Sequence, residues 1–122
     1  MEKINQMEIR DIIISEIPEV KDEVSKLSSK DNIAGAMQIV VTFTRDMLKG
    51  HHLSKVHWCI ALIGWVYGRG NEMVRDIIAN IFVRSFNGMR NLCSQVEWQI
   101  IQEQMPANLY AVYVYQNRTS SR

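Results

Sequence analysis

Apolar residues recur at three- and four-residue spacing along most of the chain, which is the period of an amphipathic helix. The last apolar segment, residues 106–116, fits either a helix or a strand. We favour the helix, because a lone strand would have no partner to pair with. The remaining expected helices cover residues 3–15, 18–28, 32–49, 53–67, 71–87 and 91–104.

Proline, glycine and capping residues mark the expected helix ends. Pro18 ends the first helix and suits the first turn of the second. Asp31 or Asn32 is the expected N-cap of the third helix. Gly50 follows that helix, and we expect it to adopt the left-handed conformation that glycine tolerates without steric cost.

The helix over residues 53–67 is apolar nearly all round, which is typical of a central helix covered on several sides. Gly68 and Gly70 end it, and Asn71 is the expected N-cap of the next helix. The polar segment "NGMRN", residues 87–91, is expected to break the chain again.

The pattern predicts an all-α protein with a single domain of five to seven helices over residues 1–116. Residues 50–55 and 70–75 have a similar order of glycine, polar, apolar and basic positions. Such short connections predict antiparallel helical hairpins, arranged either like HEAT or armadillo repeats or as an irregular bundle. Residues 117–122 are polar, and we expect a flexible C-terminal tail there.

Composition and charge exclude some classes of function. The chain is 47% hydrophobic and 22% charged, with a formal net charge of +1, so we expect no nucleic-acid or membrane partner. The longest apolar run, residues 59–68, is too short to span a bilayer, and the first residues lack a signal-peptide layout. The two cysteines fit free thiols in a reducing compartment, so we expect a cytoplasmic protein.

The stretch "KGHHLSKVHWC", residues 49–59, contains all three histidines and one cysteine. Successive residues on a helix are 100° apart, so His57 and Cys59, two residues apart, face opposite sides. Two metal ligands on one helix need a spacing of three or four residues. We therefore expect no metal site and no cofactor, with His51 at a helix start and His52 in solvent.

Catalytic groups do not converge in the sequence. Residues 33–122 contain five acidic residues, and no serine has a nucleophile-elbow context. We therefore expect no enzyme. The glycine-rich turn "GRGNEMVR", residues 68–75, could present backbone N–H groups and arginines to a phosphate or a partner carboxylate. Its candidate partner-binding residues are Arg69, Asn71, Glu72 and Arg75.

Three stretches carry a resemblance to a known kind of protein: "IPEVKDEV", "FTRDMLKG" and "VYGRGNEMVRDIIANIFVRSF". Over residues 15–87 the chain resembles a family of small, all-helical, uncharacterised bacterial proteins built from short antiparallel hairpins. Members of that family look like the immunity and accessory proteins that accompany toxins. The resemblance implies a protein partner, such as a toxin, and no known enzyme activity.

Three functions are compatible with these observations. The first is a non-catalytic protein-binding module, including an immunity protein that neutralises a toxin. The second is a structural homo-oligomer or homodimer that associates through an exposed Trp98 and the tyrosine-rich C-terminal segment. The third is a small-ligand binder or enzyme with a pocket among Trp58, Trp65 and His57.

Overall fold

Side chains cap the N-termini of four helices in the described part of the chain. The computed structural model describes residues 3–120. Asn5 and Glu8 form a reciprocal capping box at the start of the first helix. Ser94 and Glu97 form another at the start of the helix over residues 95–103. Asn32 caps the third helix by accepting a hydrogen bond from the Gly35 amide, as expected.

The elements follow one another with short connections. In chain order they are α1 (Gln6–Glu16), the 3₁₀ turn η1 (Pro18–Val20), α2 (Lys21–Ser25), α3 (Ile33–Lys49), α4 (Leu53–Arg69), α5 (Glu72–Ile77), the π-helical turn η2 (Ile78–Phe82), the 3₁₀ turn η3 (Val83–Ser85), α6 (Phe86–Arg90), α7 (Gln95–Glu103) and α8 (Ala107–Ser120).

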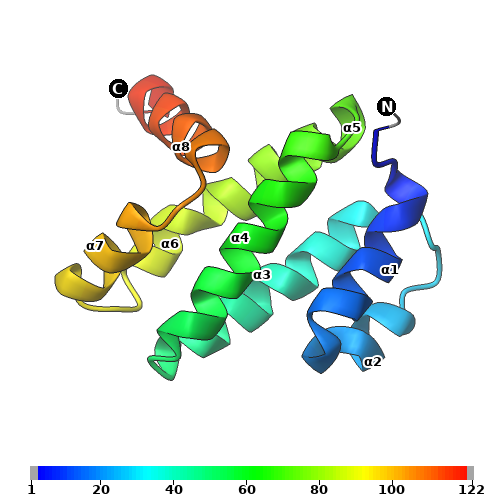
Figure 1. Ribbon diagram of the computed structural model, residues 1–122, viewed down its shortest axis with the longest axis horizontal. Coiled ribbons are helices and arrows are strands. Elements are labelled where there is room, and N and C mark those ends of the chain that lie inside the picture. The colour runs from blue at the N-terminus through cyan, green and yellow to red at the C-terminus, as the bar shows by residue number, and fades with distance from the viewer. Residues whose placement is uncertain (1–2, 121–122) are drawn as a thin grey trace.

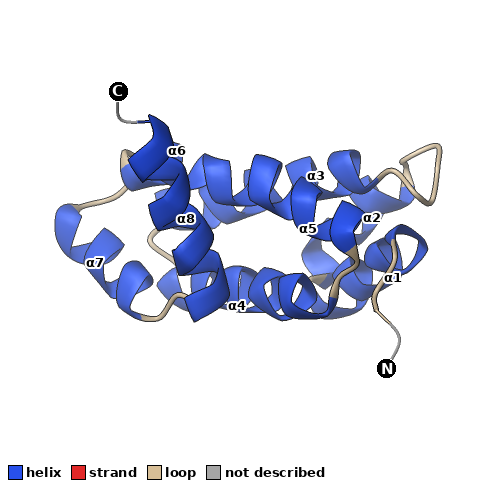
Figure 2. Cartoon of the chain, turned by 90° about the horizontal axis from the view of Figure 1, so that it is seen from above, coloured by secondary structure: helices blue, strands red, loops and turns tan. Residues whose placement is uncertain are grey.

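The helices form two layers around a shared core. Helices α1 and α4 lie on one side and α3 on the other, while α7 and α8 close one end (Figures 1 and 2). Helices α3 and α4 form an antiparallel hairpin, as the sequence predicts. The sequence predicts one apolar stripe along α3, and five of its six positions are buried, which supports the helical period there: Ile33, Met37, Val40, Thr44 and Leu48. The sixth position, Met47, is only partly buried.

The segment before α1 is fixed to the turn after α4. The Ile4 amide donates to the Arg69 carbonyl at 2.8 Å, and the Asn71 amide donates to the Ile4 carbonyl at 2.8 Å. These two bonds form an isolated bridge between Ile4 and Gly70. Because the bridge joins the start of α1 to the end of α4, the two helices run antiparallel with their ends fixed.

The helix that starts at α5 continues without a break to Arg90, through η2, η3 and α6. The expected break at residues 87–91 was therefore wrong, and the chain turns at residues 91–94 instead. Phe82, Phe86 and Met89 are fully buried along this helix, so packing keeps the polar segment helical.

An aromatic cluster joins this helix to α7 and α8. Phe86 contacts Trp98 and Tyr113 edge-on, with ring centroids 6.2 and 5.7 Å apart. Trp98 is 4% exposed. The expectation of an exposed Trp98 in a self-association surface was wrong, because α7 turns this residue, and not Val96, toward the core.

The turn between α3 and α4 differs from the expected one. Gly50 has a φ of −85° and continues the helical hydrogen bonding, donating its amide to the Asp46 carbonyl at 3.1 Å. His51 has a φ of 61° and reverses the chain. The expected left-handed Gly50 was therefore wrong. The N-cap of α4 is His52, one residue after the histidine expected at the helix start.

Segment 107–116 is helical, which confirms the favoured alternative. Helix α8 extends to Ser120, past residue 116, where the helical domain was expected to end; residues 121–122 of the expected tail lie outside the described residues. If residues 72–90 count as one continuous helix, the described chain has seven helices and no strand, which confirms the all-α prediction. No helix in residues 3–120 has both the length and the apolar character to cross a membrane.

Candidate functional site

A groove runs between α1 and α4 on the outer side of their layer. Its volume is about 530 Å³, and its α4 wall is formed by Trp58, Ala61, Leu62 and Trp65. Trp58 and Trp65 are 45% and 47% exposed, a large fraction for a side chain with so much apolar surface. We call this depression the tryptophan groove. Its α1 wall is formed by Asp11, Ile12, Ser15 and Glu16.

Trp58 is fixed in the groove by a bond to the opposite wall. Its indole Nε1 donates to the backbone carbonyl of Glu16 at 2.8 Å. The polar edge of the ring is therefore satisfied, and its apolar face is left exposed. A fixed aromatic ring loses little conformational freedom when it binds a ligand.

Trp65 is covered on one side by a cation. The Arg69 guanidinium lies over its ring at 4.5 Å from the centroid, one helical turn later. Among the described residues, Arg69 has no acidic partner. The groove therefore has a positive charge at the C-terminal end of α4.

The α1 rim of the groove is acidic. Asp11 pairs with Lys30 at 3.6 Å, whereas the Glu16 carboxylate has no basic partner among residues 3–120. Just beyond the groove, Lys55 pairs with Glu19 at 2.8 Å. The hydrogen bond from Lys55 is the main cause that lowers the pKa of Glu19 below its usual value of 4.5. Glu16 is thus the unpaired negative charge of the rim.

The candidate partner-binding residues of the second turn are placed apart by the structure. Arg69 lies at the tryptophan groove. The Asn71 side chain caps α5 by accepting from the Val74 amide at 2.9 Å, and the Arg75 guanidinium lies over Tyr67 at 5.0 Å. Glu72 is exposed in the first turn of α5. The turn's amide at Asn71 is occupied by Ile4, so it is not open to an anion.

The sequence identified one wall of the groove and missed the other. Trp58 and Trp65 line it as expected of a pocket, but the exposed His57 does not, because it lies about 100° around the helix from Trp58. The α1 wall was missed. The one residue that points to this wall is Ile12, which is apolar and yet only partly buried in the structure.

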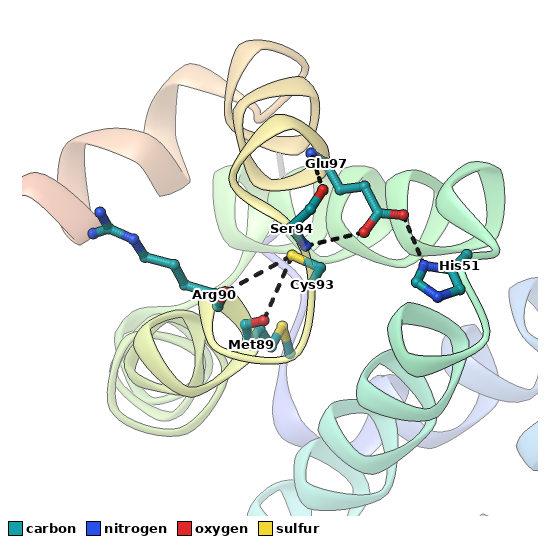
Figure 3. A network of polar contacts seen from close by, with 6 residues as sticks. All are labelled: His51, Met89, Arg90, Cys93, Ser94 and Glu97. Carbon is teal, nitrogen blue, oxygen red and sulfur yellow. Dashed lines mark hydrogen bonds and ion pairs between the residues drawn. The ribbon is translucent and has the colours of Figure 1, made fainter.

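The histidine-rich stretch forms a polar contact with α7. His51 Nδ1 lies 2.8 Å from Glu97 Oε2, and Glu97 also caps α7 through Ser94 (Figure 3). His57 and Cys59 lie on opposite faces as expected, with Cys59 fully buried and His57 exposed. Within residues 3–120, no three potential ligands gather in one place.

The thiols are poor nucleophiles in this structure. Burial raises the pKa of Cys59, and burial with the nearby Glu97 charge raises the pKa of Cys93. Both cysteines are free. Because the thiolate is the reactive form, these shifts disfavour cysteine chemistry at neutral pH.

Fold and site together define a small all-α domain with an open, tryptophan-lined groove. The chain belongs to the family described as "Domain of unknown function (DUF7674)", whose model matches residues 10–119. Comparison with curated proteins and with solved structures gave no match. The family match agrees with the expected resemblance to an uncharacterised family and extends beyond residues 15–87; it carries no information on toxin immunity.

Proposed function

We propose that this protein is a non-catalytic protein-binding module and that the tryptophan groove is its binding surface. The observation that carries the proposal is the pair of half-exposed tryptophans, Trp58 and Trp65, held on one face of a rigid helix. Tryptophan is among the residues that most often dominate binding energy in protein interfaces.

The spacing of the α4 wall indicates which shape of ligand fits. Trp58, Ala61, Leu62 and Trp65 follow the i, i+3, i+4, i+7 pattern by which one helix contacts another. Helix α1 runs alongside α4 in the opposite direction (Figure 1), and its side chains form the other wall of the groove. These features support an α-helical segment of a protein as the ligand.

Toxin immunity is a narrower form of this proposal, and its support is the resemblance over residues 15–87. In that form, the helix in the groove belongs to a toxin encoded next to this protein. We place the module in the cytoplasm, where free thiols such as Cys59 and Cys93 stay reduced.

Co-expression with the products of the neighbouring genes tests the proposal. We expect a stoichiometric complex that is lost in the Trp58→Ala and Trp65→Ala variants. Tyr110→Ala, which removes an exposed aromatic ring from α8, is the matched control and should leave the complex intact. A complex that withstands both tryptophan substitutions would contradict the groove as the binding surface.

A further inference from the structure

The outer face of α4 alternates large and small residues in a coiled-coil spacing. Trp58, Ala61, Trp65 and Gly68 are separated by three, four and three residues, so they form one continuous seam on the helix. Ala61 is partly exposed, and Gly68 is exposed. Each bulky ring is thus followed along the seam by a gap.

When two copies of α4 lie antiparallel, the large residues of one copy can face the small residues of the other. If a second α4 lies antiparallel with a two-fold axis level with Ile63, Trp58 comes opposite Gly68 of the other copy. Trp65 then comes opposite Ala61 of the other copy. All four rings meet a small residue, which is the knob-into-hole packing that helix pairs require.

We propose that the helix that occupies the tryptophan groove is α4 of a second copy of this chain, in an antiparallel isologous dimer. The proposal rests on the proposed function, since it uses the same groove, and it names the ligand. An isologous contact uses one patch twice, so each favourable pair occurs twice.

Charge supports the same register. Glu16 lies beside Trp58, because its carbonyl accepts the indole bond. In the dimer, Gly68 of the other copy faces Trp58, and the next residue is Arg69. The two-fold axis is perpendicular to the plane of the two α4 helices, so the α1 helices of both copies lie on the same side of that plane. The unpaired Arg69 of one copy therefore lies next to the unpaired Glu16 rim of the other.

The exposed ring area sets the expected strength. A tryptophan presents about 250 Å², so exposures of 45% and 47% leave about 230 Å² for two rings and about 460 Å² for the four rings of a dimer. Stable interfaces bury about 1,200 Å² or more in total. The rings supply roughly a third of that area, so we expect a weak and reversible dimer.

Sedimentation equilibrium of the native chain from micromolar to millimolar concentration measures this association. We expect a monomer–dimer equilibrium. Trp65→Ala should weaken it by roughly a thousandfold, because a hot-spot ring is lost twice, and Tyr110→Ala should leave it unchanged. A native chain that stays monomeric throughout would overturn the inference.

A charge exchange tests the register and the partner together. Glu16→Arg and Arg69→Glu each create two like-charge pairs, so each variant alone should dimerise about tenfold more weakly. Mixing the two variants should restore a heterodimer, since opposite charges then meet at both ends. Both residues are exposed, so each variant should fold, and a circular dichroism spectrum of each checks this. A dimer that ignores these substitutions would have to form through another face and would contradict the inference.

The two proposals fail in different ways. A monomeric chain whose tryptophan variants lose a heterologous partner overturns the dimer and leaves the protein-binding groove in place. A chain that neither dimerises nor loses any partner on tryptophan substitution overturns both.

Discussion

The three tryptophans of this chain divide between two regions with opposite roles. Trp98 is buried at 4% exposure in the aromatic cluster with Phe86 and Tyr113, whereas Trp58 and Trp65 are half exposed in the groove. All three are in helices, two in α4 and one in α7. The comparison teaches that one ring type stabilises the fold in one region and is left for recognition in the other.

The largest expected effect is at the buried ring. Trp98→Ala should lower the free energy of unfolding by about 3–5 kcal/mol, because it leaves a cavity beside Phe86 and Tyr113. Urea unfolding followed by circular dichroism measures the loss. Trp65→Ala is the matched variant and should cost far less, since its ring is half exposed. Equal losses for both would break the distinction between the two regions.

Helical period predicted much of the fold but not this division. The spacing of Met37, Val40 and Thr44 identifies the buried face of α3, because the neighbouring elements, α1, α4 and η2 foremost, pack against that helix and leave it one orientation. In α7, Trp98 and Val96 offer two apolar lines. The choice between them depends on Phe86 and Tyr113, which are distant in sequence. The spacing of apolar residues within α7 therefore cannot predict it.

The groove was half predicted for the same reason. Two tryptophans seven residues apart share a helix face, so their side of the groove follows from the sequence. The α1 wall depends on the bridge between Ile4 and Gly70, a contact across 66 positions of the chain. The left-handed His51 was missed because glycine is the usual residue in that conformation, and Gly50 precedes it.

Two glycines of α4 extend the comparison to its inner and outer faces. A Cβ at Gly64 would lie 2.6 Å from Cγ of Pro106, where α8 approaches. Gly64→Ala should therefore destabilise the protein by about 1–3 kcal/mol, through overpacking against a rigid ring. Thermal unfolding measures this effect.

Gly68→Ala is the matched control on the outer face. Its Cβ would lie 3.5 Å from Asn108 Nδ2, which is an ordinary contact. We expect a gain of up to about 1 kcal/mol for the monomer, since alanine favours the helix over glycine. A destabilisation as large as that of Gly64→Ala would mean that the outer face is more crowded than the structure shows.

The indole bond of Trp58 gives a smaller effect. Trp58→Phe keeps a ring in the groove and removes the donor to the Glu16 carbonyl, so it should cost about 1 kcal/mol of unfolding free energy. Chemical denaturation measures this cost. The control is Trp65→Phe, because the Trp65 indole makes no such bond among the described residues. A cost at Trp65 that matches the cost at Trp58 would show that the bond contributes nothing.

The smallest expected effect is a pH dependence at Glu97, the neighbour of the buried Trp98 on α7. The backbone bond from Ser94 and then the His51 contact lower the pKa of Glu97 below its usual 4.5. The folded state thus binds fewer protons than the unfolded state. The stabilisation is present above pH 4.5 and is lost as the pH falls through 4.5 toward the lower, folded pKa. Glu97→Gln should flatten that part of the stability curve, measured by urea unfolding at several pH values, whereas Glu103→Gln on the same helix should not. An unchanged slope in the Glu97 variant would show that this contact adds nothing to the end of the molecule where the aromatic cluster lies.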